Sequence, residues 1–237
     1  MNNYGHLSES EKDEANRMGI TQMEFIDILL KRINENNNEM IKKDNTRINL
    51  PVRKPYIVVG HGPNWIEQAK KLKNTDIPII STDVCFKPLL EIGVIPRYVI
   101  TYEEALKNVY EEMFDFEAIK EHKIKVIGSQ ITRKWLVDKL QEYGLGISLH
   151  TSPFSNVGAY GAYYAKTILQ SDRIILIGMN CYGPEKNYPF LDWFGEWKRL
   201  FASSNDKLFV NCTQGGLLYT KRVLNCDFNN LTVGYIS

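Results

Sequence analysis

The sequence predicts an α/β fold in which a mostly parallel, twisted sheet carries helices on both faces, with a helical extension before it. Two observations support this expectation. From Pro51 onward, short apolar runs alternate with segments of helical pattern, which is typical of right-handed βαβ units. The runs are also continuously apolar, as in 56–59, and strands buried on both faces require this. We therefore expect a Rossmann-like domain over residues 51–237, preceded by a helical extension and linker over residues 1–50.

The first 50 residues differ from the rest in being mostly polar. Thr21 stands three residues before Glu24, the spacing of a capping box, and Phe25, Ile28 and Ile33 follow at helical period. We expect an amphipathic helix over residues 21–40. Its apolar stripe needs a partner, either the sheet domain or another subunit, so a homo-oligomer is one expectation. Residues 42–49 are predicted to form a linker.

The elements of the sheet domain follow one another with recognisable boundaries. Gly93 and Gly144 end helices, Gly178 ends a strand, and Asn156 is a good N-cap for the helix that follows it. The apolar runs predict strands at 56–59, 77–80, 98–100, 125–127, 147–149, 173–177 and 208–210, the last followed by a short tail. The segments between them predict helices at 64–73, 83–91, 103–113, 132–143, 156–169 and 192–201. The aromatic side chains of the 192–201 helix are assigned to core or subunit packing.

Composition argues against several classes of function. The 237 residues carry a formal net charge of +1, which does not favour nucleic acid or an anionic membrane as a partner. No apolar run reaches the roughly 18 residues that a membrane span requires. The polar N-terminus has no apolar signal-peptide core, so we expect a cytoplasmic protein. The four cysteines form no CxxC pair and are expected to be buried and reduced.

The turn after the first predicted strand is the strongest sign of a ligand site. Residues 60–64 read Gly-His-Gly-Pro-Asn, and a glycine pair lets the backbone turn sharply and approach a ligand. The following helix points its free N–H groups at the same spot, which suits a phosphate. Trp65 replaces the third glycine of a dinucleotide fingerprint, and no Walker lysine follows, so NAD binding and P-loop chemistry are disfavoured. The alternative is a tight turn without a ligand.

Polar residues follow three further strands, and the carboxyl ends of parallel strands meet at the edge where ligands bind. Asp83 follows the second predicted strand and is suited to contact a ribose hydroxyl, a base or a metal, or else to cap the next helix. Asn156 and Gly158 open a helix at the same edge, where they favour an anion or simply provide capping and close packing. Residues 211–216, Asn-Cys-Thr-Gln-Gly-Gly, follow the last predicted strand.

Candidates for proton transfer are few. His61 lies inside the glycine turn and is the best candidate for a general acid or base, with His150 second. A merely solvated loop histidine is the alternative. Glu103 and Glu104 follow the third predicted strand and can supply a carboxylate. No His-x-x-x-His or Asp-x-Asp pair indicates a metal site, so none is expected.

Four segments, in this order, resemble those of one superfamily that includes the MptE-like diphosphokinases and the motility-associated-factor glycosyltransferases. Residues 59–64 are similar to the G-x-G-P-S turn of the family, and residues 83–96 to its D-x₅-L-L-x-x-G-I-x-P element. Residues 156–158 and 174–180 are similar to its N-x-G helix and I-x-L-x-G-x-D strand end. Residues 211–216 are similar to the N-C-T-E-G-G segment of the flagellin-modifying branch. The resemblance covers about residues 52–220.

The resemblance implies a Rossmann-like catalytic domain and two branches of activity. One branch transfers a nonulosonic sugar from a CMP-linked donor to protein, and the other transfers diphosphate from ATP to 6-hydroxymethylpterin with magnesium. For this chain it implies a nucleotide or nucleotide-sugar substrate, no obligate cofactor, an unidentified acceptor, and His61 or Glu103 as catalytic base. The nucleotide-binding residues that it implies are Gly60, Gly62, Pro63, Asn64, Asp83, Asn156, Gly158, Asn180, Thr213 and Gly215.

Departures from the family pattern rank these activities. Tyr102, Glu103 and Glu104 replace the aspartates that the kinase branch uses for magnesium, Asn180 stands where aspartate is usual, and Arg97 follows the proline that aspartate usually follows. The 211–216 segment is retained. We therefore expect a glycosyltransferase-like enzyme. The alternatives are an MptE-like diphosphokinase that uses ATP and magnesium, and a catalytically idle nucleotide-binding module.

Overall fold

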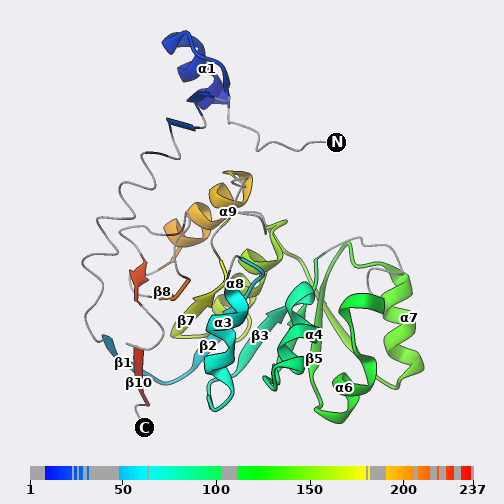
Figure 1. The fold of residues 1–237 in the computed structure, drawn as a ribbon. Helices are drawn as coiled ribbons and strands as arrows, with labels where there is room; N and C mark the ends of the chain where they lie inside the picture. Colours follow the sequence, from blue (N-terminus) through cyan, green and yellow to red (C-terminus); the bar gives the residue numbers. More distant parts are fainter. Residues whose placement is uncertain are drawn as a thin grey trace.

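Eight strands form the central sheet of the computed structural model, in the order β6–β5–β4–β3–β2–β7–β8–β9 (Figure 1). Every neighbouring pair in this sheet is parallel. The predicted α/β fold with a parallel sheet is therefore confirmed. The structure describes residues 9–22, 24–25, 27–28, 31, 48–62, 64–102, 111–179, 181, 191–204, 208–213, 218, 223–226 and 231–235.

The strands of the sheet lie within one or two residues of their predicted positions. Those foreseen are β2 (Pro55–Val59), β3 (Ile79–Thr82), β4 (Tyr98–Ile100), β5 (Lys125–Ser129), β6 (Ile147–His150), β7 (Arg173–Ile177) and β8 (Phe209–Asn211). β2, β3 and β4 are buried along their whole length, as the continuous apolar runs predict. β9 (Leu224–Asn225) is only two residues long and was not predicted, because so short a run carries no periodicity.

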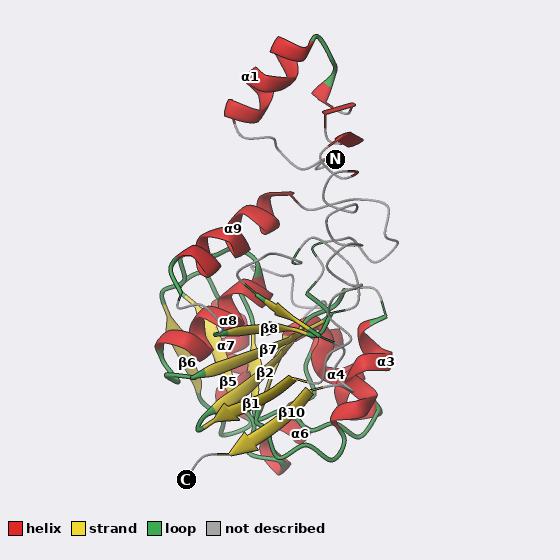
Figure 2. Ribbon diagram, turned by 90° about the vertical axis from the view of Figure 1, so that its left-hand side faces the viewer, coloured by secondary structure: helices red, strands yellow, loops and turns green. Residues whose placement is uncertain are grey.

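Helices cover both faces of the sheet (Figure 2). One face carries α8 (Val157–Thr167) and α9 (Leu191–Ala202). The other carries α3 (Trp65–Ala69), its 3-10 continuation η1 (Lys70–Leu72), α4 (Asp83–Glu91), α6 (Phe116–Glu121) and α7 (Lys134–Glu142). All were predicted except α6, a short helix that Asp115 caps by accepting a hydrogen bond from the Ala118 N–H (2.9 Å). Most of the helix predicted at 103–113 lies outside the described residues; Glu111–Met113 are helical.

Alternation along β2 divides the core between the two faces. Tyr56 and Val58 belong to a cluster that includes residues of α8 and α9, and Ile57 and Val59 belong to a second cluster with α3 and α4. A third cluster joins α4 to β4, β5, α6 and α7. Successive side chains of a strand point to opposite faces, so one buried strand holds together helices on both sides of the sheet.

A strand just before the central sheet pairs with a strand that follows it. β1 (Ile48–Val52) and β10 (Leu231–Tyr235) form a separate two-stranded parallel sheet, in which Ile48 is opposite Leu231. Residues 48 and 49 of the predicted linker belong to β1, and β10 lies in the predicted short tail, whereas residues 42–47 lie outside the described part of the chain. The proposed boundary between residues 50 and 51 falls inside β1. Both segments have apolar residues at every second position, Ile48, Leu50 and Val52 in β1 and Leu231, Val233 and Tyr235 in β10, a strand pattern that the prediction overlooked.

The N-terminal extension begins with α1 (Glu9–Met18), which stands apart from the sheet in Figure 1. The predicted capping box is confirmed: the Thr21 N–H donates to a Glu24 carboxylate oxygen (2.8 Å), and the Glu24 N–H donates to the Thr21 hydroxyl (3.2 Å). The hydrogen bond from the Thr21 backbone lowers the pKa of Glu24. The described residues from Gln22 to Lys31 are helical, and residues 32–40 of the predicted helix lie outside the described part. None of the described helices is both long and apolar enough to cross a membrane.

β2 and β7 approach each other most closely just beyond their carboxyl ends. The Gly60 N–H donates to the Ile177 carbonyl (2.9 Å), and the Gly62 N–H donates to the Gly178 carbonyl (2.8 Å). Gly178 has a φ of +69°. A Cβ at this position would lie 2.0 Å from the Gly60 carbonyl oxygen and 2.8 Å from the Trp65 Cβ. Residue 178 therefore has to be glycine both for its backbone conformation and for the contact between the two strand ends.

Replacement of Gly178 by alanine separates these two effects when Gly144 serves as control. Gly144 has a φ of +70°, and a Cβ there would meet nothing within 4 Å. We expect Gly144→Ala to lower the free energy of unfolding by about 1 kcal/mol, from the left-handed backbone alone. Gly178→Ala should lower it by about 3 kcal/mol or more, because the strand ends must move apart. Urea denaturation measures both, and equal losses would contradict the close contact.

Candidate functional site

The order in which the chain adds strands to the sheet reverses between β2 and β7. From β2 the chain adds β3, β4, β5 and β6 on one side, then returns to place β7 on the other side of β2. In open parallel sheets, ligands bind in the crevice at the carboxyl ends of the strands at such a switch point. We call the residues gathered there the carboxyl-edge site: Gly60, His61, Gly62, Asn64, Asp83, Asn156, Val157, Gly158, Met179 and Thr213.

The glycine turn closes the end of the sheet. Because the N–H groups of Gly60 and Gly62 donate to carbonyls of β7 and the residue after it, neither is available to a phosphate. The backbone N–H groups of His61 and Asn64 remain available as hydrogen-bond donors, since neither has an acceptor in the described part of the chain. Pro63 lies outside the described residues. The two glycines therefore allow the ends of β2 and β7 to approach each other closely. Their own N–H groups are not donors to the predicted phosphate.

Asn64 occupies the N-cap position of α3, as predicted, but its side chain does not cap the helix. Its backbone is left-handed, with φ 61° and ψ 13°, and its side chain makes no capping hydrogen bond. Asparagine adopts this conformation more readily than most residues because its short polar side chain tolerates it. The side chain of Asn64 is therefore exposed at the glycine turn and does not satisfy the free N–H groups of α3.

His61 is exposed at the same turn, with its ring centroid 5.7 Å from that of Trp65. Desolvation by the surrounding protein lowers the pKa of His61 below its ordinary value, so the ring is neutral at pH 7 and can accept a proton. His150 lies at the end of β6, four strands away from β2. At the usual strand spacing this is roughly 19 Å, which separates His150 from the glycine turn.

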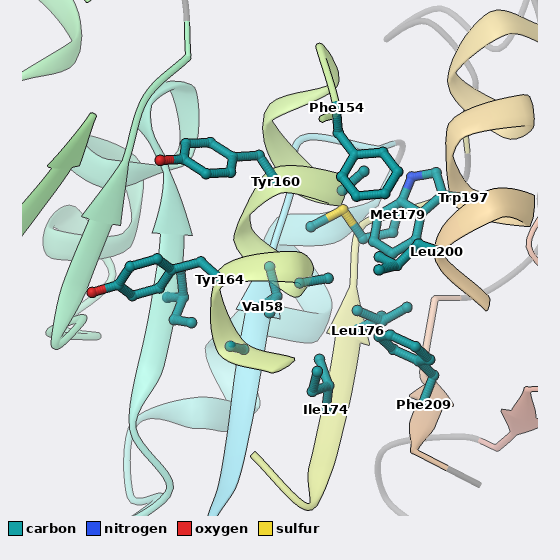
Figure 3. Packing of buried hydrophobic residues seen from close by; sticks show 14 of the residues in the cluster. Val58, Phe154, Tyr160, Tyr164, Ile174, Leu176, Met179, Trp197, Leu200 and Phe209 are labelled. Carbon is teal, nitrogen blue, oxygen red and sulfur yellow. The ribbon is translucent and has the colours of Figure 1, made fainter. Parts of the chain in front are cut away.

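Met179 fills the space beside two of the predicted ligand glycines. A Cβ on Gly60 would lie 2.6 Å from the Met179 sulfur, and a Cβ on Gly158 would lie 2.5 Å from the same atom. The Met179 side chain is buried in the cluster under α8 and α9, with Phe154 and Trp197 (Figure 3). Because Gly60 and Gly158 have no side chains, the Met179 thioether fits between them. The close packing that was the alternative interpretation for Gly158 is what the structure contains.

Asp83 is buried at the start of α4, with 1% of its surface exposed. One carboxylate oxygen accepts a hydrogen bond from the Val84 N–H (2.9 Å), and the other accepts from the Thr101 hydroxyl (2.6 Å). Thr82 occupies the N-cap position, so Asp83 is the first helical residue rather than the cap. Asp83 therefore links the start of α4 to the residue that follows β4, and its predicted contact with a ribose stays a prediction.

Asn156 caps α8 as predicted, because its side-chain oxygen accepts a hydrogen bond from the Ala159 N–H (2.8 Å). A carboxylate from another helix also accepts hydrogen bonds at this helix end. Glu196 of α9 accepts hydrogen bonds from the Ser155 N–H (3.0 Å), the Ser155 hydroxyl (2.5 Å) and the Asn156 N–H (2.8 Å). A side chain of the protein thus supplies an anion at this helix end, where the helix dipole favours negative charge.

Glu196 is a site residue that sequence reasoning missed. It is buried, and it adjoins Trp197 within the helix that was assigned only to packing. The sequence did contain a signal for it. A glutamate on the apolar face of an amphipathic helix is expected to be buried, and a buried carboxylate needs hydrogen-bond partners. Cys181, just after β7, lies close enough for the Glu196 charge to add to the effect of burial, and both raise the pKa of the Cys181 thiol.

The segment after β8 supports the end of β7. The Thr213 hydroxyl accepts a hydrogen bond from the Met179 N–H (2.9 Å), and the Thr213 N–H donates to the Asn211 side chain (3.1 Å). Asn211 in turn donates to Asn225 of β9 (3.1 Å). Cys212 and Cys226 are buried, as predicted, and the fold brings their sulfur atoms to 3.6 Å. Thr213 therefore positions Met179 rather than facing open solvent.

Four predicted site residues, Pro63, Glu103, Asn180 and Gly215, lie outside the described residues, as does Glu104. The remaining predicted residues lie near the carboxyl ends of β2, β3 and β7, whereas His150 lies at the carboxyl end of β6, on the far side of the same edge. Within the part of the chain that the structure describes, no three histidine, cysteine, aspartate or glutamate side chains are grouped as metal ligands.

Comparison with known proteins gives one family and one related fold. Residues 28–185 match the model of a family described as "6-hydroxymethylpterin diphosphokinase MptE-like". A search of curated proteins gave no match. The chain is similar to the structure of MAf glycosyltransferase from Magnetospirillum magneticum AMB-1, with a TM-score of 0.53 and 14% identity. The match covers 77% of this chain but 35% of that chain, so it spans about a third of its length, and at this identity it concerns the fold alone.

Substitution of Glu196 by glutamine tests the carboxylate at the start of α8. Glutamine keeps the shape but replaces one acceptor oxygen with an NH₂ group that faces N–H and O–H donors. We expect a loss of about 2–3 kcal/mol in the free energy of unfolding, because charged hydrogen bonds are replaced and one donor is left unpaired. Glu121→Gln, at an exposed position of α6, should change it by less than about 0.5 kcal/mol. Similar values for both variants in urea denaturation would refute the capping role.

Proposed function

The chain belongs to the MptE-like family, and from this membership we propose that it is a glycosyltransferase-like enzyme that uses a nucleotide-activated sugar. One observation carries the proposal. An anion-binding helix end, α8, and a turn with an exposed neutral histidine meet at the carboxyl edge of the sheet, at its switch point. The similarity in fold to the MAf glycosyltransferase supports this choice within the family.

The donor in this proposal is CMP-linked and carries a nonulosonic acid. The resemblance of residues 211–216 to the flagellin-modifying branch supports it, and Thr213 from that segment lies at the carboxyl edge. Asn180 and Gly215 are proposed to contribute to the same nucleotide site. Asp83 acts indirectly, because its carboxylate is buried and holds the start of α4 against Thr101.

The phosphate is proposed to bind between the first turn of α8 and the glycine turn. The N–H groups at the start of a helix have no acceptor within it. Glu196 and the Asn156 side chain accept from Ser155, Asn156 and Ala159, which leaves Val157 and Gly158 as donors in this turn. Backbone N–H groups and the positive end of the helix dipole stabilise a departing phosphate monoester without reorganisation.

His61 is proposed as the base for the acceptor hydroxyl. Its neutral ring accepts the proton as the hydroxyl oxygen bonds to the anomeric carbon and the bond from that carbon to the CMP phosphate breaks. The lowered pKa of His61 supports this assignment, because a base has to be unprotonated at the working pH. Glu103 remains the other proposed base.

A second candidate function is that of an MptE-like diphosphokinase, which the printed description of the matching family favours. That activity requires magnesium and ATP. Asp83 does not favour a magnesium site, because its carboxylate is buried and already accepts hydrogen bonds from Val84 and Thr101. A catalytically idle nucleotide-binding module is favoured by a different observation, the Met179 side chain that occupies the space beside Gly60 and Gly158.

Nucleotide binding is tested most directly with Asn64→Asp. Aspartate tolerates the left-handed backbone and suits an N-cap position, so stability should stay within about 0.5 kcal/mol. The added negative charge should weaken binding of CMP at least tenfold in calorimetric titration, by repulsion of its phosphate. Asn74→Asp, an exposed change at the opposite edge of the sheet, is the matched control and should leave the affinity unchanged.

Titration with CMP, CDP, UDP, GDP and ATP with magnesium ranks the candidate functions. Preference for CMP supports the glycosyltransferase, and AMP release that depends on 6-hydroxymethyl-dihydropterin establishes the diphosphokinase instead. Binding without turnover of any donor identifies the idle module. Absence of binding by all five nucleotides would refute the proposed site.

The role of His61 predicts a specific pH dependence. Because its pKa is lowered from 6.5, kcat/KM for release of CMP from a CMP-nonulosonate donor should fall only below pH 6.5, where the base becomes protonated. We expect His61→Gln to lower kcat at least about a hundredfold and to remove this acid limb. Full activity with an unchanged pH profile in His61→Gln would assign the base elsewhere.

A further inference from the structure

A pocket of about 560 Å³ opens at the amino edge of the sheet, on the side opposite the carboxyl-edge site. Its walls come from the residues just before β3 and β4, the start of β2, the segment after η1 and the turn after α6. The lining residues are Tyr56, Leu72, Lys73, Thr75, Asp76, Ile77, Pro78, Ile79, Gly93, Ile95, Pro96, Arg97, Tyr98 and His122. The volume falls within the range of small-molecule sites.

Basic side chains predominate at the rim of this amino-edge pocket. Lys73, Arg97 and His122 face one acidic residue, Asp76. Neither Lys73 nor Arg97 forms an ion pair with any described residue. Exposed cations around a concave surface raise the local concentration of anions.

Two tyrosines line the inner part of the pocket. Tyr56 and Tyr98 are buried, with ring centroids 6.1 Å apart. Burial, reinforced by the neighbouring Tyr98, raises the pKa of Tyr56 to about 12, so Tyr56 is neutral at pH 7 and presents an uncharged aromatic ring to the pocket. Arg97 is close enough to Tyr56 to oppose this rise in pKa.

The remaining wall is apolar. Leu72 and Ile77 are buried, whereas Ile95 has 52% of its side chain exposed beside Pro96. An acidic group alone would leave this wall in contact with water. A ligand that joins an acidic group to a ring satisfies both halves of the pocket, because it pairs with the cations and covers the apolar surface.

We propose that the amino-edge pocket binds a small organic anion, in which a phosphate or carboxylate is attached to a flat ring. The residues that would hold it are Arg97 and Lys73 for the acidic group, and Tyr56, Ile95 and Pro96 for the ring. β3 separates this pocket from the carboxyl-edge site by roughly 10 Å of strand. The pocket is therefore a second site, and its occupancy does not depend on the function proposed above.

Titration of the ¹⁵N-labelled chain with phenyl phosphate, benzoate, phenol and inorganic phosphate tests this site. We expect phenyl phosphate or benzoate to perturb the amide signals of residues 73–77, 79 and 97–98, and to bind at least ten times more tightly than phenol or inorganic phosphate. Whichever of the two ring anions binds more tightly identifies the acidic group. Perturbation of residues 60–62 and 157–158 instead would place the probe in the carboxyl-edge site and overturn the proposal.

Charge reversal at the rim completes the test. Arg97→Glu and, independently, Lys73→Glu should each weaken binding of the ring anion at least tenfold, since each replaces an attraction with a repulsion. Arg17→Glu in α1, exposed and apart from the sheet, makes the same change in charge and should leave the affinity within twofold. Arg97→Glu should also leave CMP binding unchanged, which separates the two sites. No binding by any probe, or equal weakening by Arg17→Glu, would refute the second site.

Discussion

The contact between the ends of β2 and β7 is the constraint on which the carboxyl edge depends. The Gly60 and Gly178 backbones approach so closely that no side chain fits between them, and two hydrogen bonds hold the approach. This contact sets where α3 begins, since Trp65 packs directly against Gly178. It also directs the chain after β7, so that Met179 enters the core and donates its N–H to Thr213. A sheet with looser strand ends would leave these groups unaligned.

The start of α8 shows how the protein uses its own charges. Glu196 provides the anion that the helix end attracts, and it joins α9 to α8 through three hydrogen bonds. A ligand phosphate at the next two N–H groups would share the same positive potential with this carboxylate. In the proposed function, the affinity for the phosphate would therefore depend on its distance from the Glu196 carboxylate, and so on the position of α9.

The two edges of the sheet differ in how their charged groups are satisfied. At the carboxyl edge, Asp83 and Glu196 are buried, and partners within the fold hold both of them. At the amino edge, Lys73 and Arg97 surround a pocket without an ion pair to any described residue. Internal pairing stabilises the fold and orients α4 and α8. Unpaired cations at a concave surface remain available to a ligand.

The sequence by itself determined the elements whose signals are local. Continuous apolar runs placed β2 to β8, the spacing of Thr21 and Glu24 placed a capping box, and Asn156 placed the start of α8. The order of four short segments indicated the family. These features depend on backbone conformations and hydrogen bonds among residues a few positions apart, so a single sequence contains the information.

Which distant groups form hydrogen bonds and contacts with one another became clear from the tertiary structure alone. Glu196 reaches Asn156, Thr101 reaches Asp83, Met179 fills the space beside Gly60 and Gly158, and β1 pairs with β10. The identity of a long-range partner depends on how strands and helices are packed, and no local pattern encodes that arrangement.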